Sequence, residues 1–124
     1  MSNCIITIVT ISKNHCQGLS NTLDSVNHQD YPGIEHIIID GNSDDGSKEL
    51  LDSYSHSKLY TYCSESDNGI SSAFNKGLEK SNGDLLFFLN SGDVLTSNTI
   101  ISEVVDSYLT HGWKCAVGRT ITTN

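Results

Sequence analysis

Acidic side chains follow three successive strand-like segments of the sequence, at the places where those segments end. Asp40 follows the first of these, Glu65 and Asp67 follow the second, and Asp93 follows the third. Because the carboxyl ends of parallel strands lie at one edge of a sheet, where open α/β proteins bind ligands, we expect these carboxylates to gather there. Carboxylates that lie close together repel one another unless a cation compensates. Mg²⁺ or Mn²⁺, which prefer oxygen ligands, would do so and would let this edge accept a diphosphate.

Each of these acids taken singly is more typical of a loop aspartate or glutamate that caps a helix or a turn. A second pattern follows Asp67, which begins an acid-Asn-Gly turn and the apolar helical spacing of residues 70–78. Asn75 and Lys76 lie midway along that helix. They either face the ligand or form an ordinary solvated pair, and the sequence gives the two interpretations equal weight.

The segment that leads to Asp93 is predicted to be a central strand. Residues 85–89 are five consecutive apolar residues, whereas a half-exposed strand would alternate polar and apolar side chains. We therefore expect this strand to be buried on both faces. It ends in the turn Asn90-Ser91-Gly92-Asp93, which makes Asp93 the first candidate for a ligand contact.

Strands and helices alternate along the whole chain. Apolar runs predict strands at 5–11, 34–39, 59–63, 85–89 and 115–118, and helical spacing predicts helices around 19–26, 50–54, 70–78 and 100–109. Asp44 or Ser43 can cap the second helix. Since the connections are too long for hairpins, we expect parallel β-α-β units with right-handed crossovers. The predicted fold class is α/β, with a mostly parallel sheet covered by helices on both faces.

Composition excludes several classes of protein. The length of 124 residues suits one domain, and the net charge of -8 argues against a nucleic-acid partner and an anionic membrane surface. Neither a transmembrane segment of roughly 20 apolar residues nor a cleavable signal is recognisable, so we expect a cytoplasmic protein. A peripheral position at the inner face of the membrane stays an alternative. The four scattered cysteines do not have the spacing of a zinc site or a redox pair.

Six motifs, taken in order, resemble the family 2 glycosyltransferases. These are inverting enzymes of the GT-A fold, with a Rossmann-like nucleotide-binding half, and the most similar subgroup makes bacterial surface polysaccharides. The motifs are the β-branched strand 6–11, Leu-Asp-Ser-Val with Gln-Asp-Tyr-Pro in 23–32, Ile-Asp-Gly-Asn-Ser-Asp-Asp-Gly at 39–46, Ser-Glu-Ser-Asp-Asn-Gly-Ile at 64–70, Asn-Lys-Gly at 75–77, and the Gly-Asp and Phe-Leu-Asn-Ser-Gly-Asp of 83–93.

The resemblance implies a binding site for a UDP-sugar donor. Thr10 and Ser12 would line the nucleotide pocket, and Asp40 would hydrogen-bond the uracil base. Asp67 would lie against the nucleoside, with Asn75 and Lys76 near it on the pocket wall. These assignments rest on the matching motifs alone.

The turn Asn90 to Asp93 occupies the place of the family's Asp-x-Asp motif. There Asn90 and Ser91 would contact the nucleotide sugar, and Asp93 would hold the Mg²⁺ or Mn²⁺ that bridges the diphosphate and helps it leave as a Lewis acid. Many members have two acids in this turn, whereas Asn90 and Gly92 leave Asp93 as its single carboxylate here. A neutral Asn-Ser-Gly-Asp variant occurs in the family.

Family members continue well beyond a chain of this length, with an acceptor-binding half and the general base. We therefore expect residues 1–124 to be a single nucleotide-sugar-binding domain without the acceptor-binding half and without a candidate base. The whole enzyme would transfer a hexosyl group from a UDP-sugar to a saccharide or lipid-linked acceptor.

Two other classes stay open at this point. A truncated, non-catalytic domain would expose apolar surface and act through self-association as a homo-oligomer or through a partner chain. A receiver-type signalling domain suits the length, but Cys63-Ser64 stands where that class needs its phosphoacceptor aspartate, and Gly118-Arg119 where it needs a lysine.

Overall fold

The computed structural model describes residues 4–55, 58–66 and 70–112. Strands and helices alternate strictly through these residues, as predicted. In chain order they are β1 (Ile6–Ser12), α1 (Cys16–Asn27), β2 (Ile34–Asp40), α2 (Ser47–Ser53), β3 (Leu59–Ser64), α3 (Ile70–Lys80), β4 (Leu85–Phe88) and α4 (Ile100–His111). The strand predicted at 115–118 lies outside the described residues.

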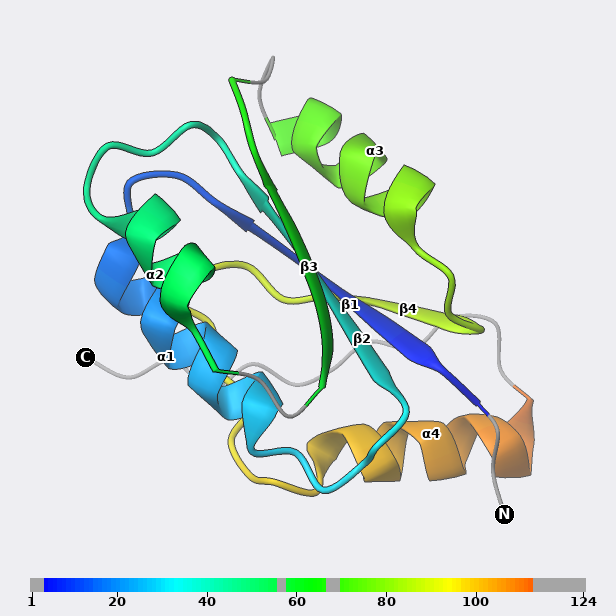
Figure 1. Cartoon of the computed structure of the whole chain (residues 1–124). Helices are drawn as coiled ribbons and strands as arrows, with labels where there is room; N and C mark the ends of the chain where they lie inside the picture. The colour runs from blue at the N-terminus through cyan, green and yellow to red at the C-terminus, as the bar shows by residue number, and fades with distance from the viewer. Residues whose placement is uncertain (1–3, 56–57, 67–69, 113–124) are drawn as a thin grey trace.

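The four strands form one parallel sheet in the order β3-β2-β1-β4 (Figure 1). Parallel pairing confirms the predicted β-α-β units, because each strand returns to the sheet only after a helix. In the register, Ser12 of β1 lies opposite Asp40 of β2, which in turn lies opposite Ser64 of β3. The ends of three adjacent strands are therefore aligned at the carboxyl edge of the sheet.

Helices cover both faces of the sheet, as the sequence predicted. Alternate residues of the strands point to opposite faces, so Ile6 and Ile8 pack with Val26 of α1 and with α4 on one face. On the other face, Ile37 and Ile39 pack against Ala73 of α3. The helix α2 joins the first face, where Leu51 packs with α1. None of the helices in the described ranges is long and apolar enough to cross a membrane.

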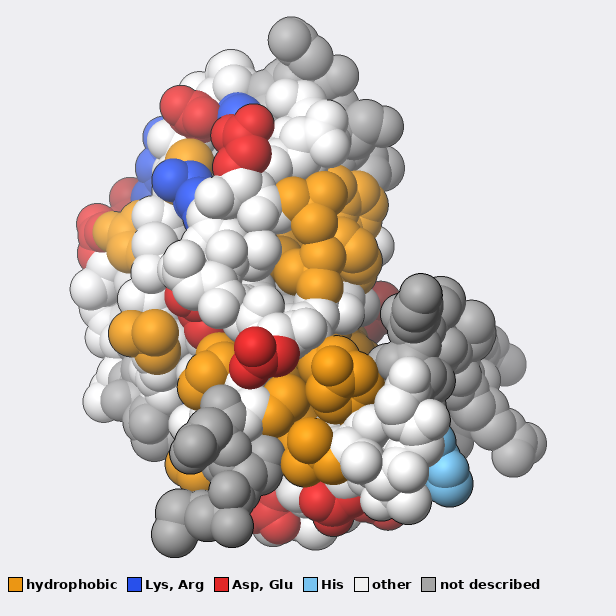
Figure 2. Space-filling view, turned by 90° about the vertical axis from the view of Figure 1, so that its right-hand side faces the viewer, with side chains coloured by type: hydrophobic (Ala, Val, Ile, Leu, Met, Phe, Trp, Pro, Cys, Tyr) orange, Lys and Arg blue, Asp and Glu red, His pale blue; other side chains and the backbone are white. Residues whose placement is uncertain are grey.

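The predicted burial of the strand before Asp93 on both faces was wrong for the described part of the chain. There β4 is the edge strand next to β1, and its burial alternates, with Leu86 39% and Phe88 45% exposed. The reason is that α3 lies mainly over β1 and β2, although Phe74 of α3 makes an edge-to-face contact with Phe88 of β4. Hydrophobic side chains accordingly gather on the side of the molecule shown in Figure 2. The central strands are β1 and β2, whose residues are almost all buried.

Candidate functional site

The loops that follow β1 and β2 are bound to each other beyond the carboxyl edge of the sheet. The Asn14 amide donates to Ser43 Oγ at 2.8 Å, and the Asp44 amide donates to Asn14 Oδ1 at 2.9 Å. The Gly41 amide donates to the carbonyl of Ser12 at 2.8 Å, which continues the sheet pairing into the loops. Because Asn14 adopts a left-handed backbone with φ of 50°, its amide and side chain both reach the second loop.

Asp40 lies under these loops and is fully buried. Its Oδ2 accepts hydrogen bonds from the Ser43 amide at 2.9 Å and from Ser64 Oγ at 2.8 Å, and its Oδ1 accepts one from Ser43 Oγ at 2.6 Å. A carboxylate has about four acceptor positions, and the described residues fill three of them, which leaves one on Oδ1 without a partner from this part of the chain. Asp40 thus ties the loop after β2 to the end of β3.

A neighbouring acid, Asp45, caps two helices at once. Its Oδ2 accepts from the Cys16 amide at the start of α1 at 2.9 Å, and its Oδ1 accepts from the Ser47 hydroxyl at 2.6 Å and amide at 3.2 Å at the start of α2. The hydrogen bond from the Ser47 hydroxyl, followed by that from Cys16, lowers the pKa of Asp45. The prediction of Asp44 or Ser43 as the cap of this helix was wrong, because α2 begins only at Ser47, whose amide and hydroxyl bond Asp45.

The two predicted site residues of β1 differ in their bonding. Thr10 is fully buried, and its hydroxyl bonds His36 Nε2 of β2 at 2.8 Å. Ser12 is 7% exposed, and its Oγ is the one buried side-chain polar atom in the described ranges that has no hydrogen-bond partner. A buried hydroxyl without a partner costs free energy, so a ligand atom that bonded Ser12 would stabilise the complex.

Residues Asn90 to Asp93 form a tight turn that is fixed to α1. Gly92, with φ of 95°, has the left-handed backbone that the turn requires. The hydroxyl of Thr22 accepts from the Gly92 amide at 3.0 Å and donates to the carbonyl of Asp93 at 2.7 Å. The Ser91 amide continues the pairing with β1 by donating to the carbonyl of Ile11 at 3.1 Å. The turn therefore lies at the carboxyl edge, where the sequence predicted it.

Asp93 presents an exposed side chain from this turn. Its backbone is held by Thr22 and by the carbonyl of Asn90, whereas no group among the described residues bonds to its carboxylate. The Asn90 side chain is exposed as well. Both are placed to meet a ligand from solvent.

The sequence missed two residues that hold this turn. One is Thr22, and the other is His15, whose Nδ1 lies 3.3 Å from Ser91 Oγ. Nothing local marks either residue, since their partners lie about 70 residues further along the chain. A faint signal is Gly18, which leaves room for the ring of His15 one helical turn earlier.

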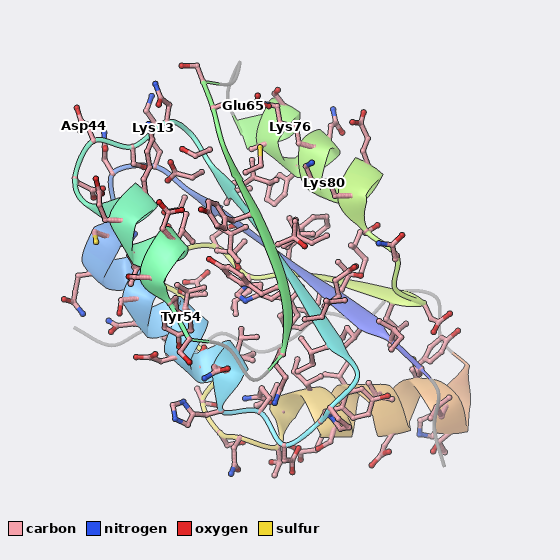
Figure 3. The ribbon with its side chains drawn as sticks, viewed as in Figure 1. Lys13, Asp44, Tyr54, Glu65, Lys76 and Lys80 are labelled. Carbon is pink, nitrogen blue, oxygen red and sulfur yellow. The ribbon has the colours of Figure 1, made fainter. Side chains whose placement is uncertain are left out.

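On the other side of the sheet edge, Lys76 of α3 pairs with Glu65 after β3. Their Nζ and Oε1 atoms lie 2.9 Å apart, and Figure 3 shows the two side chains together where β3 ends and α3 begins. The hydrogen bond with Lys76 lowers the pKa of Glu65. Asn75 is exposed on α3, while Asp67 lies outside the described residues. Lys76 thus faces the sheet edge, with 23% of its side chain exposed.

The expected gathering of carboxylates was wrong for the described part of the chain. No group of three or more His, Cys, Asp or Glu side chains comes together there to hold a metal ion. The reason is the strand order, which places β1 between Asp40 at the end of β2 and Asp93 after β4. Asp93 alone still fits a magnesium-type ion, because such ions are commonly held by one carboxylate together with substrate phosphates.

A parallel sheet between two helical layers, with polar turns beyond its carboxyl edge, is an α/β architecture of the kind that binds nucleotides. The family model of glycosyl transferase family 2 matches residues 7–124. The chain belongs to this family. The match places the chain in this family and not in the receiver-type class.

Two relatives illustrate the sequence similarity. An uncharacterized glycosyltransferase of Mycobacterium tuberculosis is 38% identical over 103 residues, which are 82% of this chain and 39% of the relative. The amylovoran biosynthesis glycosyltransferase AmsB of Erwinia amylovora is 31% identical over 97 residues, 75% of this chain and 32% of the relative. The chain therefore spans about a third to two fifths of the length of these relatives.

Solved structures confirm the GT-A fold. Residues 1–349 of TarS from S. aureus, in complex with UDP-GlcNAc, match with a TM-score of 0.81 and 17% identity, over 96% of this chain and 37% of that chain. The mannosyltransferase PcManGT from Pyrobaculum calidifontis, in complex with GDP-Man and Mn²⁺, matches with a TM-score of 0.77 and 18% identity, over 87% and 33%.

Proposed function

We propose that this chain is the donor-binding part of an inverting glycosyltransferase that takes a hexosyl group from a UDP-sugar. The acceptor would be a saccharide or a lipid-linked saccharide in polysaccharide synthesis. The observation that carries the proposal is the turn Asn90 to Asp93, which α1 fixes at the carboxyl edge with an exposed carboxylate. The amylovoran biosynthesis enzyme among the relatives and the UDP-GlcNAc complex among the structures support the acceptor class and the donor.

The uridine would lie over the ends of β1, β2 and β3. Ser12 offers a hydroxyl without a partner, and Asp40 keeps one acceptor position on Oδ1, which suits the imino N–H of uracil. Thr10 would form the floor, since its hydroxyl is engaged with His36. Lys76 would stand on the wall of the pocket, together with Asn75 and Asp67.

The ribose and the diphosphate would lie at the turn after β4. Asn90 and Ser91 would contact the ribose, and Asp93 would supply the protein ligand of Mg²⁺ or Mn²⁺. When bound, this ion would stabilise the negative charge that develops on the departing diphosphate. The task of the chain's own residues is to hold the donor still, so that an acceptor hydroxyl can attack the sugar carbon opposite the leaving group.

Calorimetric titration of the 124-residue chain with UDP, with and without Mn²⁺, tests the proposal, with GDP as the comparison nucleotide. We expect UDP to bind more tightly than GDP and Mn²⁺ to strengthen UDP binding. In Ser12→Ala we expect UDP affinity to fall roughly fivefold, the loss of one hydrogen bond. Ser20→Ala, a partly exposed serine of α1, is the control. Equal affinity for both nucleotides, or no binding of either, would contradict the proposal.

A further inference from the structure

The ring of His15 lies in a slot formed by two glycines. A Cβ atom added to Gly18 of α1 would come within 2.3 Å of His15 Cε1, and one added to Gly92 of the turn would come within 2.5 Å of the same atom. Real Cβ atoms do not approach other atoms so closely. The ring therefore occupies its place only because both neighbours lack side chains, one on the helix and one on the turn after β4.

The same slot is closed by hydrogen bonds between helix and turn. The amide of Gly92 donates to the carbonyl of Gly18 at 3.2 Å, and His15 Nδ1 and Ser91 Oγ lie 3.3 Å apart. This contact engages one ring nitrogen with the turn. Nε2 has no hydrogen-bond partner among the described residues, and the His15 side chain is exposed to solvent.

The N-terminus of α1 is partly occupied by an acid of the loop after β2. The Cys16 amide, the first of the helix, already donates to the carboxylate of Asp45 at 2.9 Å. The imidazole of His15 adds a side-chain hydrogen-bonding group at this end of α1, beside the turn. Its neighbour Gly92 stands where many family members have a carboxylate, so the ring takes up space beside the turn that an acidic side chain would otherwise need.

We propose that His15 is a donor-site residue that binds the diphosphate of the nucleotide sugar. Nδ1 fixes the ring to Ser91, and Nε2–H donates to a phosphate oxygen held over the turn Asn90 to Asp93. This inference rests on the proposed function, because it assigns a residue to the diphosphate end of the same site. A role in binding the donor explains why two glycines make room for an exposed ring at this place. Packing of α1 against the turn would not by itself require such a ring.

The test compares the nucleotide with the nucleoside in the full chain. UDP and uridine are titrated calorimetrically into wild type, His15→Phe and His15→Gln, each with and without Mn²⁺. His15→Phe keeps an aromatic ring between the glycines but removes both ring nitrogens, while His15→Gln keeps an N–H donor. The matched control is His28→Phe, an exposed histidine at the opposite end of α1.

We expect UDP affinity to fall roughly tenfold in His15→Phe, the loss of one hydrogen bond to a charged oxygen, while uridine affinity stays at the wild-type value. His15→Gln should recover part of the loss, and His28→Phe should bind both ligands like wild type. Unchanged UDP affinity in His15→Phe, or an equal loss for UDP and uridine, would overturn the assignment and leave the proposed function standing. Failure of the wild-type chain to bind UDP under either condition would overturn both.

Discussion

Two aspartates at the carboxyl edge of the sheet, Asp40 and Asp93, have opposite surroundings. Asp40 is fully buried, and its carboxylate accepts three hydrogen bonds from Ser43 and Ser64. Asp93 is exposed, and among the described residues it is held through its backbone alone, by Thr22 and Asn90. The Asp40 carboxylate is hydrogen-bonded within the protein and keeps a single acceptor position, whereas the Asp93 carboxylate is exposed to solvent.

This difference points to two separate roles that a carboxylate can have at the edge of the sheet. A carboxylate surrounded by protein donors fixes the loops, whereas a carboxylate on a turn that is fixed by other groups can bind a ligand without first breaking protein contacts. The edge thus combines a hydrogen-bonded part, around the ends of β1, β2 and β3, with a turn from which the side chains of Asn90 and Asp93 are exposed. Substitutions at the two positions should therefore affect different properties of the protein.

The largest effect is expected for Asp40→Ala. The amide and hydroxyl of Ser43 and the hydroxyl of Ser64 would lose their acceptor, and buried donors without partners are costly. We expect the free energy of unfolding, measured in urea, to fall by about 3 kcal/mol. Asp44→Ala, which removes an exposed carboxylate four residues further on, should change it by less than about 0.5 kcal/mol. Equal stability of the two variants would contradict the structural role of Asp40.

A smaller effect is expected for Thr22→Val, which keeps the shape of the side chain and removes its hydroxyl. The Gly92 amide and the carbonyl of Asp93 would lose their bonds to the Thr22 hydroxyl, although the Gly92 amide keeps the carbonyl of Gly18 as a partner. We expect a loss of about 1.5 kcal/mol in the free energy of unfolding. UDP affinity should fall as well, because the turn is held by fewer hydrogen bonds.

Thr22→Ser is the control for this substitution, since it retains the hydroxyl and should bind UDP like wild type. If Thr22→Val lowers the free energy of unfolding but leaves UDP affinity unchanged, then α1 stabilises the fold without positioning the turn for ligand.

Glu35 provides a third comparison, at the opposite end of β2. Its carboxylate accepts from the Thr7 hydroxyl at 2.8 Å and from the backbone and side chain of Asn82 at 2.9 and 3.1 Å. Burial alone raises the pKa of Glu35, but these hydrogen bonds outweigh it and lower the pKa below its ordinary value. A lowered pKa in the folded state stabilises the protein above the unfolded pKa, and this stability is lost as the pH falls through the folded value.

We therefore expect Glu35→Gln to lower the free energy of unfolding by about 1 kcal/mol at pH 7. The difference from wild type should shrink as the pH is lowered from 5 to 3, as shown by urea unfolding at each pH. Glu49→Gln, at an exposed glutamate of α2, is the control and should change the free energy of unfolding at pH 7 by less than about 0.5 kcal/mol. A constant difference between wild type and Glu35→Gln would show that the charge of Glu35 does not contribute.

Much of the fold could be predicted from the sequence, because the patterns that mark each helix and each strand lie within a few neighbouring residues. Apolar spacing marked each helix, and β-branched or apolar runs marked each strand, so the β-α alternation and the parallel sheet followed. The position of β4 could not be predicted in the same way. A run of apolar residues is compatible with a central strand and with an edge strand that one helix covers only in part, and strand order depends on packing between distant segments.

The same distinction between local and distant signals applies to the residues of the candidate site. Asp40 and Asp93 were predictable from their places after strands, whereas their surroundings were not. Thr22 reaches Asp93 across 71 residues and His15 reaches Ser91 across 76, so no spacing in the sequence connects them. The partners of Asp40 likewise come from two elements, and only the folded chain shows that its carboxylate is already engaged.

The smallest effect on stability is expected for Asp93→Ala, which completes the comparison with Asp40. Its carboxylate has no bond partner among the described residues, and the backbone contacts of the turn do not depend on it. The free energy of unfolding should therefore change by less than about 0.5 kcal/mol. If Asp93 holds the metal, the variant should lose the strengthening of UDP binding by Mn²⁺ while its metal-free affinity stays close to wild type. A variant that keeps the Mn²⁺ effect would place the ion on other ligands, and one that unfolds more easily would remove the distinction between the two aspartates.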